Sequence, residues 1–200
     1  MDIALILKSP TFEEEVKEDT VIYADAGYKH KDKVGDKTVL AVVGDFDSLG
    51  KAPSNEKTIG LNVEKNYTDG ERALRYAFEK GFDRVVIYGA FGGKIEHVLG
   101  NIALLKIARD LGKKAIIKNG QTVMELLEKS TLLNAKKDSA LSLIPYGGDC
   151  KFIKSENLYY ALDGLTLTPS DTRGISNVVM DENVQIDIEN GFALAIYTAK

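Results

Sequence analysis

Short apolar runs alternate with longer segments of helical periodicity from the N-terminus to about Gly120. The strand-like runs are residues 3–7, 21–24, 39–43, 58–63, 84–88 and 114–118. Two of the segments between them, residues 68–81 and 94–112, repeat their apolar residues at the spacing of a helix. This alternation predicts a Rossmann-like α/β fold, in which a mainly parallel sheet carries helices on both faces.

The two helical segments differ in their pattern. The first begins at a capping residue, Thr68 or Asp69, gathers apolar residues on one face and stops at Gly81. The second is apolar around much of its circumference and ends at Gly112. We therefore expect the first to lie on the surface of the sheet and the second to be buried.

The pattern changes after about Gly120. From Thr122 onward the chain consists of short runs that alternate polar and apolar residues or contain aromatic residues, and nothing of helical length follows. The sequence Asn190-Gly191 between two such runs is a strong signal for a β-hairpin. These features predict two domains, an α/β domain at residues 1–122 and an all-β sandwich at residues 123–200.

Composition narrows the class of protein. The chain has 200 residues, a net charge of −4, 44% hydrophobic and 28% charged residues, which is typical of a soluble globular protein. Its charge gives no general attraction to nucleic acid or to an anionic membrane. A single cysteine, Cys150, excludes an internal disulfide and a multi-cysteine zinc site. The N-terminal apolar run is too short for a signal peptide or a membrane span, so we expect a cytoplasmic protein.

Polar clusters follow four of the predicted strands. They are residues 25–30, 44–48, 64–69 and 89–97. In a parallel sheet, ligands bind beyond the carboxyl ends of the strands. One acidic residue at a strand end is most often a cap or turn residue. Four clusters at one edge of one sheet are better explained by a binding site.

The pair Asp45 and Asp47 follows a buried strand, with Phe46 between them. In a regular strand the two carboxylates would point to the same face and repel each other, unless a cation or water separates them. Mg²⁺ prefers one or two carboxylates together with water and phosphate oxygens. Asp69 is a candidate third ligand. The alternative, a solvated turn in which Asp69 is only a helix cap, stays open at this point.

A glycine-rich segment links the strand at 84–88 to the second helix. Gly89, Gly92 and Gly93 leave backbone amides that can receive phosphate at the start of a helix, and Lys94 can meet the charge of a polyphosphate. The segment is neither a Walker A loop nor the dinucleotide fingerprint. By itself it indicates only a glycine turn.

The two histidines have weaker signals. His97, at the front of the second helix, is expected to pack or to orient another group rather than act as a base. His30 lies in a lysine-rich stretch and is expected to be exposed.

A polar segment interrupts the strand pattern of the second half at residues 170–177, and it contains Ser176 and Asn177. It is either a solvated loop or a set of hydrogen-bonding groups for a polar organic ligand.

In order along the chain, the motifs "ADAG", "GDFDSL", "EKNYTDGERAL", "GAFGGKIEHVLGNI" and "GISN" resemble those of the thiamine pyrophosphokinase (thiamine diphosphokinase) family. The likeness runs from about residue 23 to residue 177. It implies a homodimeric enzyme with thiamine bound near the subunit junction. It also implies transfer of a diphosphoryl group from ATP to the hydroxyl of thiamine, which gives thiamine diphosphate and AMP and requires Mg²⁺.

The resemblance also implies roles for individual residues. It makes residues 1–122 the nucleotide-binding catalytic domain and residues 123–200 the thiamine-binding domain. The implied catalytic and metal-binding residues are Asp45, Asp47 and Asp69. The implied nucleotide-binding residues are Asp25, Gly27, Gly92, Gly93, Lys94, Glu96 and His97. The implied thiamine-binding residues are Asn66, Thr68, Ser176 and Asn177.

The chain departs from the family pattern at several of these positions. Asn66 and Glu96 stand where the family usually has Asp, Lys94 stands for Arg, and Val178 follows the Ser-Asn pair where a Glu is common. Lysine keeps the charge of arginine but loses its bidentate fork. The chain also has no tryptophan, so the indole that stacks on thiamine in some members is missing.

These departures leave other functions open. One is a thiamine- or nucleotide-binding module without turnover, and another is a diphosphokinase that acts on a different alcohol, such as a pterin. A phosphotransferase with an aspartyl nucleophile also places Asp-x-Asp after an apolar strand. Such an enzyme would also need a lysine and a second pair of acidic residues at later strand ends, and these cannot be located in the sequence.

Overall fold

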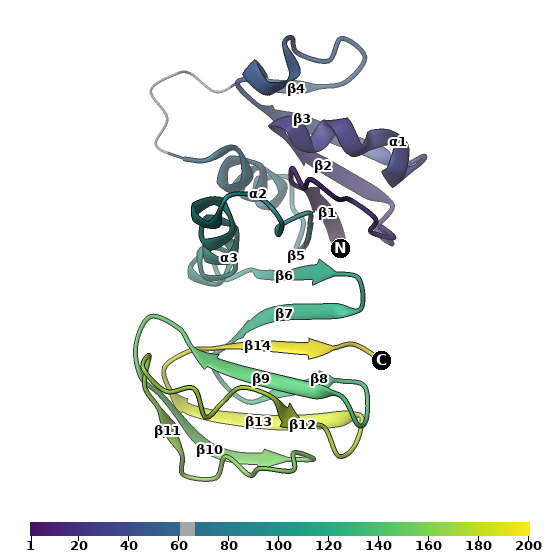
Figure 1. Ribbon diagram of the computed structural model, residues 1–200. Helices are drawn as coiled ribbons and strands as arrows, with labels where there is room; N and C mark the ends of the chain where they lie inside the picture. The colour runs from purple at the N-terminus through teal and green to yellow at the C-terminus, as the bar shows by residue number, and fades with distance from the viewer. Residues whose placement is uncertain (61–66) are drawn as a thin grey trace. The chain divides into compact units, whose positions relative to one another are not determined.

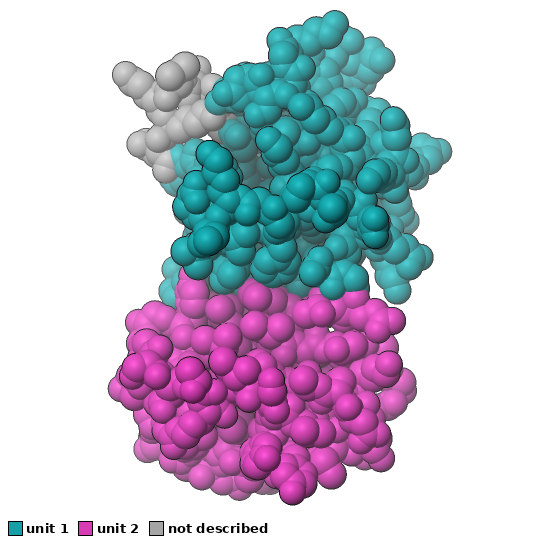
Figure 2. Space-filling model, viewed as in Figure 1, with its two compact units in different colours: residues 1–120 teal, residues 121–200 magenta. Residues whose placement is uncertain are grey.

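Parallel strands in the first part of the chain and antiparallel strands in the second divide the protein into two units. The computed structural model describes residues 1–60 and 67–200, and the units are Met1–Gly120 and Gln121–Lys200 (Figures 1 and 2). The predicted thiamine-binding residue Asn66 and the end of the predicted strand at 58–63 lie outside the described residues.

The strands of the first unit form a parallel sheet, as predicted (Figure 1). They are β1 (Asp2–Ile6), β2 (Thr20–Ala24), β3 (Thr38–Gly44), β4 (Thr58–Gly60), β5 (Arg84–Tyr88) and β6 (Lys114–Asn119). Their order in the sheet is β6-β5-β1-β2-β3-β4. The chain therefore adds strands on one side of β1 as far as β4 and then continues on the other side with β5. Such a reversal is the topological switch point at which α/β proteins bind ligands.

The helical elements follow the strand ends. They are η1 (Asp25–His30), α1 (Lys31–Val34), η2 (Asp47–Leu49), α2 (Asp69–Glu79) and α3 (Ile95–Asp110). The cap predicted for α2 is confirmed, because the hydroxyl oxygen of Thr68 accepts a hydrogen bond from the N–H of Glu71 at 3.2 Å. Among the described residues, no helix combines the length and the apolar character that crossing a membrane requires.

Both faces of the parallel sheet are covered, as the sequence predicts. On one face, Val34 of α1 and the apolar side chains Phe12 and Val16 pack with alternate residues of the strands. The residues between them, such as Leu5 and Ile22, are fully buried on the opposite face. Helix α2 packs against β1, β2, β3 and β5.

Helix α3 is not the buried helix that its composition suggests. Only Leu104, Leu105 and Ala108 are buried, whereas Ile95 is 77% exposed and Leu99 is 62% exposed. The helix packs against α2 and β6, and its buried residues lie in its second half. The prediction was wrong because apolar composition alone does not say how much of a helix the rest of the chain covers.

The second unit has the two antiparallel sheets predicted for a β-sandwich, and none of its residues, all of which are described, forms a helix. Its strands are β7 (Thr122–Leu127), β8 (Thr131–Asn134), β9 (Ala140–Pro145), β10 (Cys150–Glu156), β11 (Thr166–Leu167), β12 (Asn177–Val178), β13 (Asn183–Asn190) and β14 (Ala193–Thr198). The order is β12-β9-β14-β7 in one sheet and β11-β10-β13-β8 in the other.

The predicted hairpin at Asn190-Gly191 is wrong. Strand β13 pairs with β10 and β8, whereas β14 pairs with β7 and β9, so the chain crosses from one sheet to the other at this point. A Cβ atom at Gly191 would lie 2.1 Å from the carbonyl oxygen of Asp149, and its φ is +88°. Glycine is thus required for the close backbone approach at this crossing.

Candidate functional site

Three carboxylates meet at the carboxyl ends of β2 and β3. One oxygen from each of Asp25, Asp45 and Asp47 lies within 4.8 Å of the others. Asp25 directly follows β2 and Asp45 directly follows β3. Because these strands are parallel neighbours, their carboxyl ends share one edge of the sheet. The structure therefore brings together Asp45 and Asp47, as the sequence analysis expected, and adds Asp25 to them.

The spacing of Asp45 and Asp47 suggested a regular strand, but the two residues do not lie on one. Strand β3 ends at Gly44, and Phe46 takes the left-handed conformation at φ +62°. The N–H of Asp47 donates a hydrogen bond to Oδ1 of Asp45 at 3.3 Å. Phe46 packs against the core of the first unit. The two carboxylates are thus gathered by a tight turn that the apolar ring of Phe46 anchors.

Gly44 sets the approach of this turn to Asp25. A Cβ atom at Gly44 would lie 3.0 Å from the Cβ atom of Asp25 and 3.2 Å from its Cα atom. Only glycine leaves that space free. The main chain therefore fixes the separation of the β2 and β3 ends that carry the acidic cluster, which we define as Asp25, Asp45 and Asp47.

The donor set of the acidic cluster fits a divalent cation. Oδ1 of Asp25 is buried and accepts no hydrogen bond from the described residues. A buried carboxylate oxygen without a partner costs free energy, and two further carboxylates nearby increase that cost. A small cation with oxygen ligands, such as Mg²⁺, would satisfy all three groups.

The predicted residues of the third strand-end cluster that the structure describes lie apart from these three carboxylates. Asp69 is the first residue of α2 and is half-buried, and it is not one of the three grouped carboxylates. Thr68 is exposed, and its hydroxyl oxygen caps α2. Their predicted roles with metal and thiamine stay predictions.

The glycine-rich segment lies between β5 and α3. Gly89 has a φ of +71°, and a Cβ atom there would lie 2.5 Å from the carbonyl oxygen of Leu7, so the loop passes close to the end of β1. The remaining predicted nucleotide-binding residues of this segment are exposed: Gly92, Gly93, Lys94, Glu96 and His97. Lys94 is the N-cap residue of α3, and its side chain makes no capping hydrogen bond. The first turn of α3 is thus presented to solvent.

The expectation that His30 is exposed is wrong, and the expectation for His97 is wrong in part. His97 is exposed, so it does not pack, whereas its expected role of orienting another group stays a prediction. His30 is half-buried, its ring stacks on Phe12 at 4.6 Å between centroids, and its Nε2 accepts a hydrogen bond from the N–H of Ser9 at 3.2 Å. Burial lowers the pKa of His30, and the charge of Lys33 lowers it further. Nothing in the lysine-rich sequence signals this contact, since its partners lie in another segment.

In the second unit, Asn177 is buried rather than presented to a ligand. It is 6% exposed, its Oδ1 accepts a hydrogen bond from the N–H of Tyr160 at 3.0 Å, and its Nδ2 donates to the carbonyl oxygen of Tyr160 at 2.7 Å. Ser176, its neighbour, is exposed and has a φ of +60°. Of the predicted thiamine-binding pair, Ser176 is the residue with a free surface.

An exposed aromatic pair, which the sequence offers as a candidate only because it lies in the second half of the chain, is beside Asn177. Tyr159 and Tyr160 are 63% and 62% exposed, and their rings meet edge to face at 4.8 Å. The N–H of Tyr159 donates to the carbonyl oxygen of Val178, so the pair runs alongside the Ser176-Asn177 segment. The sequence shows only two consecutive tyrosines in a strand-like run. Because both faces of a strand can be buried, this pattern does not tell whether the two side chains are exposed.

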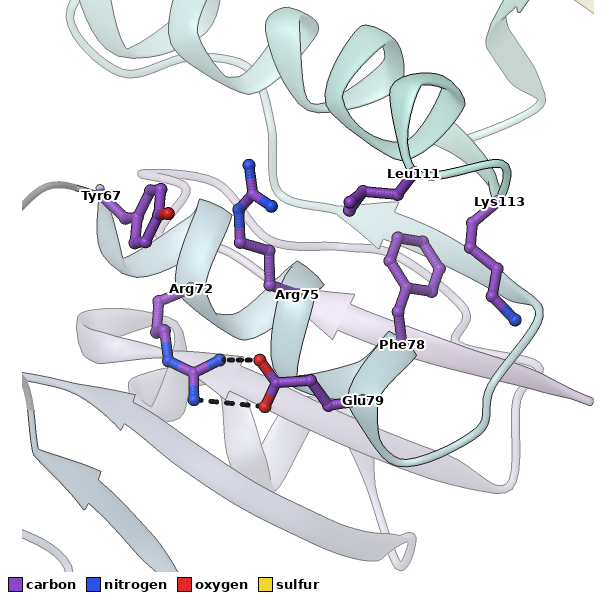
Figure 3. Close-up of a pocket in the computed structure, with 7 residues that line it drawn as sticks. All are labelled: Tyr67, Arg72, Arg75, Phe78, Glu79, Leu111 and Lys113. Atoms are coloured by element: carbon purple, nitrogen blue, oxygen red, sulfur yellow. Dashed lines mark hydrogen bonds and ion pairs between the residues drawn. The ribbon is translucent and has the colours of Figure 1, made fainter.

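A cavity of about 350 Å³ lies elsewhere in the first unit (Figure 3). Its lining residues are Tyr67, Arg72, Arg75, Phe78, Glu79, Leu111 and Lys113. Arg72 makes two hydrogen bonds with Glu79, at 2.9 and 3.3 Å, and Arg75 pairs with Glu71. Its arginines are therefore already neutralised, and no member of the acidic cluster lines it. The acidic cluster is the stronger candidate for a site of chemistry.

Comparison with known proteins identifies the family. The sequence model described as "Thiamin pyrophosphokinase, catalytic domain" matches residues 13–117, and that described as "Thiamin pyrophosphokinase, vitamin B1 binding domain" matches residues 129–193. The chain belongs to the thiamine pyrophosphokinase family. Thiamine pyrophosphokinases are enzymes that make thiamine diphosphate by pyrophosphate transfer, and this chain is accordingly an enzyme of that class.

Individual relatives agree with this assignment. Thiamine pyrophosphokinase of Bacillus subtilis is 29% identical over 161 residues, which are 76% of this chain and 75% of that protein. The crystal structure of the B. subtilis thiamine pyrophosphokinase has a TM-score of 0.86 at 22% identity, with 100% of both chains covered. Yeast thiamin pyrophosphokinase has a TM-score of 0.75 at 13% identity, with 98% of this chain and 86% of that chain covered. The two structures share the fold of this chain.

Proposed function

We propose that this chain transfers a diphosphoryl group from ATP to the hydroxyl group of thiamine and releases AMP, with Mg²⁺ as cofactor. The acidic cluster carries the proposal. It places three carboxylates, one with a buried oxygen that lacks a partner among the described residues, at the edge of a parallel sheet. That arrangement suits a metal-bound polyphosphate, and it occurs within the residues matched by the catalytic-domain model.

Asp25, Asp45 and Asp47 would hold the ion. When bound, Mg²⁺ neutralises charge that develops on the phosphate oxygens in the transition state. The residues themselves need little movement, because the main chain at Gly44 and the turn at Phe46 already bring the carboxylates together. Preorganised groups of this kind stabilise developing charge without a cost of reorganisation.

The glycine-rich segment and α3 would receive the phosphates. Gly92 and Gly93 are exposed and leave backbone N–H groups accessible, and the ammonium group of Lys94 stands at the start of α3. A helix N-terminus attracts anions through its unbonded N–H groups and its dipole. Glu96 and His97, in the first turn, and Gly27, in η1, complete the proposed nucleotide contacts.

Asp69 is proposed to accept the proton of the thiamine hydroxyl. A free aspartate has a pKa of about 3.9, so it is a weak base. A weak base suffices where the leaving group departs early and the nucleophile carries little charge, as in loose phosphoryl-transfer transition states. Thr68 and Asn66 are proposed to contact thiamine near this residue.

Exposed aromatic side chains in the second unit would bind the rings of thiamine. The thiazolium ring is cationic, and aromatic faces attract cations by about 0.5–2 kcal/mol. Tyr159 and Tyr160 offer such faces beside Ser176. We assign the thiamine contact to Ser176 and the tyrosine pair, with Asn177 holding Tyr160 in place.

A second copy of the chain is the proposed partner. Ile95 and Leu99 expose large apolar side chains on the first half of α3. Burying such residues against a partner stabilises an assembly by about 1.5–3 kcal/mol for each side chain. This supports the homodimer that the family resemblance implies.

The deciding experiment incubates the protein with thiamine, ATP and Mg²⁺ and separates the products by chromatography. Thiamine diphosphate and AMP in equal amounts are the expected products. Thiamine monophosphate with ADP would contradict the proposed diphosphoryl transfer. Replacing thiamine by a hydroxymethyl pterin in a parallel reaction tests the alternative acceptor, and omission of Mg²⁺ with added chelator is the matched control.

A further inference from the structure

The segment that follows β1 lies between two loops of the proposed nucleotide site. On one side, a Cβ atom at Gly27 of η1 would lie 2.2 Å from the carbonyl oxygen of Ile6. On the other side, a Cβ atom at Gly92 would lie 3.1 Å from Cγ of Pro10. Residues 6–10 are therefore in direct contact both with the element that begins at Asp25 and with the glycine-rich segment.

Ser9 is the polar residue at the centre of this segment, and it is only 8% exposed. Its Oγ lies 3.2 Å from the carbonyl oxygen of Phe91 and 3.0 Å from that of Thr11. A hydroxyl group has a single proton, so it shares that proton between the two carbonyls or donates to one of them. Through Phe91, Ser9 is joined to the glycine-rich segment.

The main-chain N–H of Ser9 points the other way, to η1. It donates to Nε2 of His30 at 3.2 Å, and the imidazole ring stacks on Phe12 with an interplanar angle of 13°. An imidazole nitrogen that accepts a hydrogen bond carries no proton, so His30 is neutral, with its proton on Nδ1.

Burial of the His30 ring and a neighbouring positive charge favour that neutral form. Lys33, from α1, is the charged group that acts on it, and the Nζ atom of Lys33 donates to the carbonyl oxygen of Phe12 at 3.0 Å. The loop after β1 contributes the N–H of Ser9 and the ring of Phe12. Burial, the larger effect, and the charge of Lys33 both lower the pKa of His30.

We propose that Ser9 and His30 are positioning residues that hold the glycine-rich segment and η1 in one arrangement for nucleotide binding. The inference rests on the proposed function only for the identity of the nucleotide. Neither residue needs to touch the substrate: Ser9 bonds to both elements, and His30 supplies the acceptor that keeps Ser9 in place. Protonation of Nε2 would turn that acceptor into a donor that faces the N–H of Ser9.

Two variants of His30 distinguish the role of its hydrogen-bond acceptor from that of its stacked ring. His30→Phe keeps a planar ring for stacking on Phe12 but leaves the buried N–H of Ser9 without a partner. His30→Gln loses the ring but keeps an amide oxygen at the reach of Nε2. We expect His30→Phe to raise the dissociation constant of a non-hydrolysable ATP analogue about tenfold, the size of effect that a buried donor without a partner produces. His30→Gln should restore most of the affinity.

Ser9→Ala provides a second, milder test, because it removes only the hydroxyl group that reaches Phe91. We expect it to weaken binding of the analogue about threefold to tenfold, the effect of one lost neutral hydrogen bond. Its main-chain N–H still reaches His30, so the fold around η1 is kept. This variant stays informative if His30→Phe does not fold.

The pH profile gives a readout that a merely structural role would not move. In the wild-type protein, affinity for the analogue should fall at acidic pH, below the ordinary histidine pKa of about 6.5, as His30 takes up a proton. In His30→Gln that part of the fall should be absent, while the titration of phosphates and carboxylates, common to both proteins, remains. The ratio of the two profiles isolates His30.

Calorimetric titration of the analogue in the presence of Mg²⁺ measures all four proteins, and chromatography of the wild-type products tests the proposed function separately. Wild-type affinity in both His30→Phe and Ser9→Ala, or a failure of His30→Gln to recover affinity and to flatten the pH profile, would overturn the positioning roles. Nucleotide binding that changes as expected, without any thiamine diphosphate from the wild type, would instead overturn the proposed function. Imidazole nitrogen resonances give a further check: the chain has two histidines, so His30→Gln leaves His97 alone and identifies the His30 signal, which should show the Nδ1–H form.

Discussion

Asn177 holds the main chain of Tyr160 through both ends of its amide, accepting from its N–H at 3.0 Å and donating to its carbonyl oxygen at 2.7 Å. The same Oδ1 accepts from the N–H of Val178 at 2.8 Å. A buried side chain with these bonds has little capacity left for a ligand. Asn177 therefore supports the main chain of Tyr160, the residue to which we assign a contact with thiamine.

Replacing Asn177 by Asp removes the donor to Tyr160 and buries a carboxylate next to a carbonyl oxygen. We expect a rise in the KM for thiamine of about tenfold and a loss of stability of about 1–3 kcal/mol, with the KM for ATP unchanged. Steady-state kinetics and urea denaturation measure the two effects. An equal rise in both KM values would show that Asn177 does not act through the thiamine side alone.

The ring of Tyr160, rather than its hydroxyl group, is expected to bind thiamine. Tyr160→Phe should therefore keep the wild-type KM for thiamine, whereas Tyr160→Ala should raise it by about three- to thirtyfold, the loss of one cation–π contact. Ile153→Ala, at an exposed residue of β10, is the matched control for truncating a large surface side chain. If Tyr160→Ala behaves like that control, the ring has no part in binding.

Asp25, a member of the acidic cluster, and Asp69, which lies outside it, are predicted to cause different defects when they are replaced. Asp25→Asn removes a carboxylate from the group of three and should lower kcat by about 10²-fold or more and raise the Mg²⁺ concentration needed for half-maximal activity. Asp69→Asn should lower kcat without that change in the Mg²⁺ requirement.

Magnesium titrations of the two variants distinguish these roles, with Glu189→Gln, which removes an exposed partner of Lys151, as the control for loss of one negative charge. A shift of the Mg²⁺ requirement in Asp69→Asn but not in Asp25→Asn would instead make Asp69 the metal ligand.

His30 also makes the stability of the fold depend on pH. Its pKa is lowered in the folded protein, so the unfolded chain binds more protons in the range between the folded value and the ordinary value of about 6.5. Its contribution to stability is therefore fully present above pH 6.5 and is lost as the pH falls through that range. Denaturation at a series of pH values should show a shallower acid slope in His30→Gln than in the wild type. Identical slopes would contradict the neutral state of His30 in the fold.

The exposed apolar residues of α3 predict an assembly. Leu99→Lys places a charge among the exposed apolar side chains of α3 and should convert the proposed dimer to a monomer. Light scattering after gel filtration measures the mass. Leu132→Lys, at an exposed leucine of β8 in the second unit, is the control and should leave the mass unchanged. A monomeric wild type would remove the basis for this prediction.

Much of the fold follows from local patterns. The strands at 84–88 and 114–118, the cap at Thr68 and the change to antiparallel strands after Gly120 are all encoded by residues close together in the sequence. The meeting of Asp45 with Asp47 could be predicted for the same reason, although the turn at Phe46, not a regular strand, produces it.

The features that could not be predicted depend on residues distant in sequence. Asp25 joins the acidic cluster because β2 and β3 are neighbours, and His30 is half-buried because Ser9 and Phe12 return to it from the end of β1. Asn190-Gly191 has the composition of a hairpin, but the strands on its two sides have better partners in opposite sheets. Pairing competition of this kind has no local signal.

The close contact between Gly44 and Asp25 has a consequence for ion size. Gly44 offers no side-chain ligand, but it limits how far apart the ends of β2 and β3 stand. It would therefore limit the radius of a cation held by the proposed ligands of the acidic cluster. Selectivity between magnesium and the larger calcium ion would then depend on the main chain, and the single methyl group that alanine adds at position 44 would be enough to alter it.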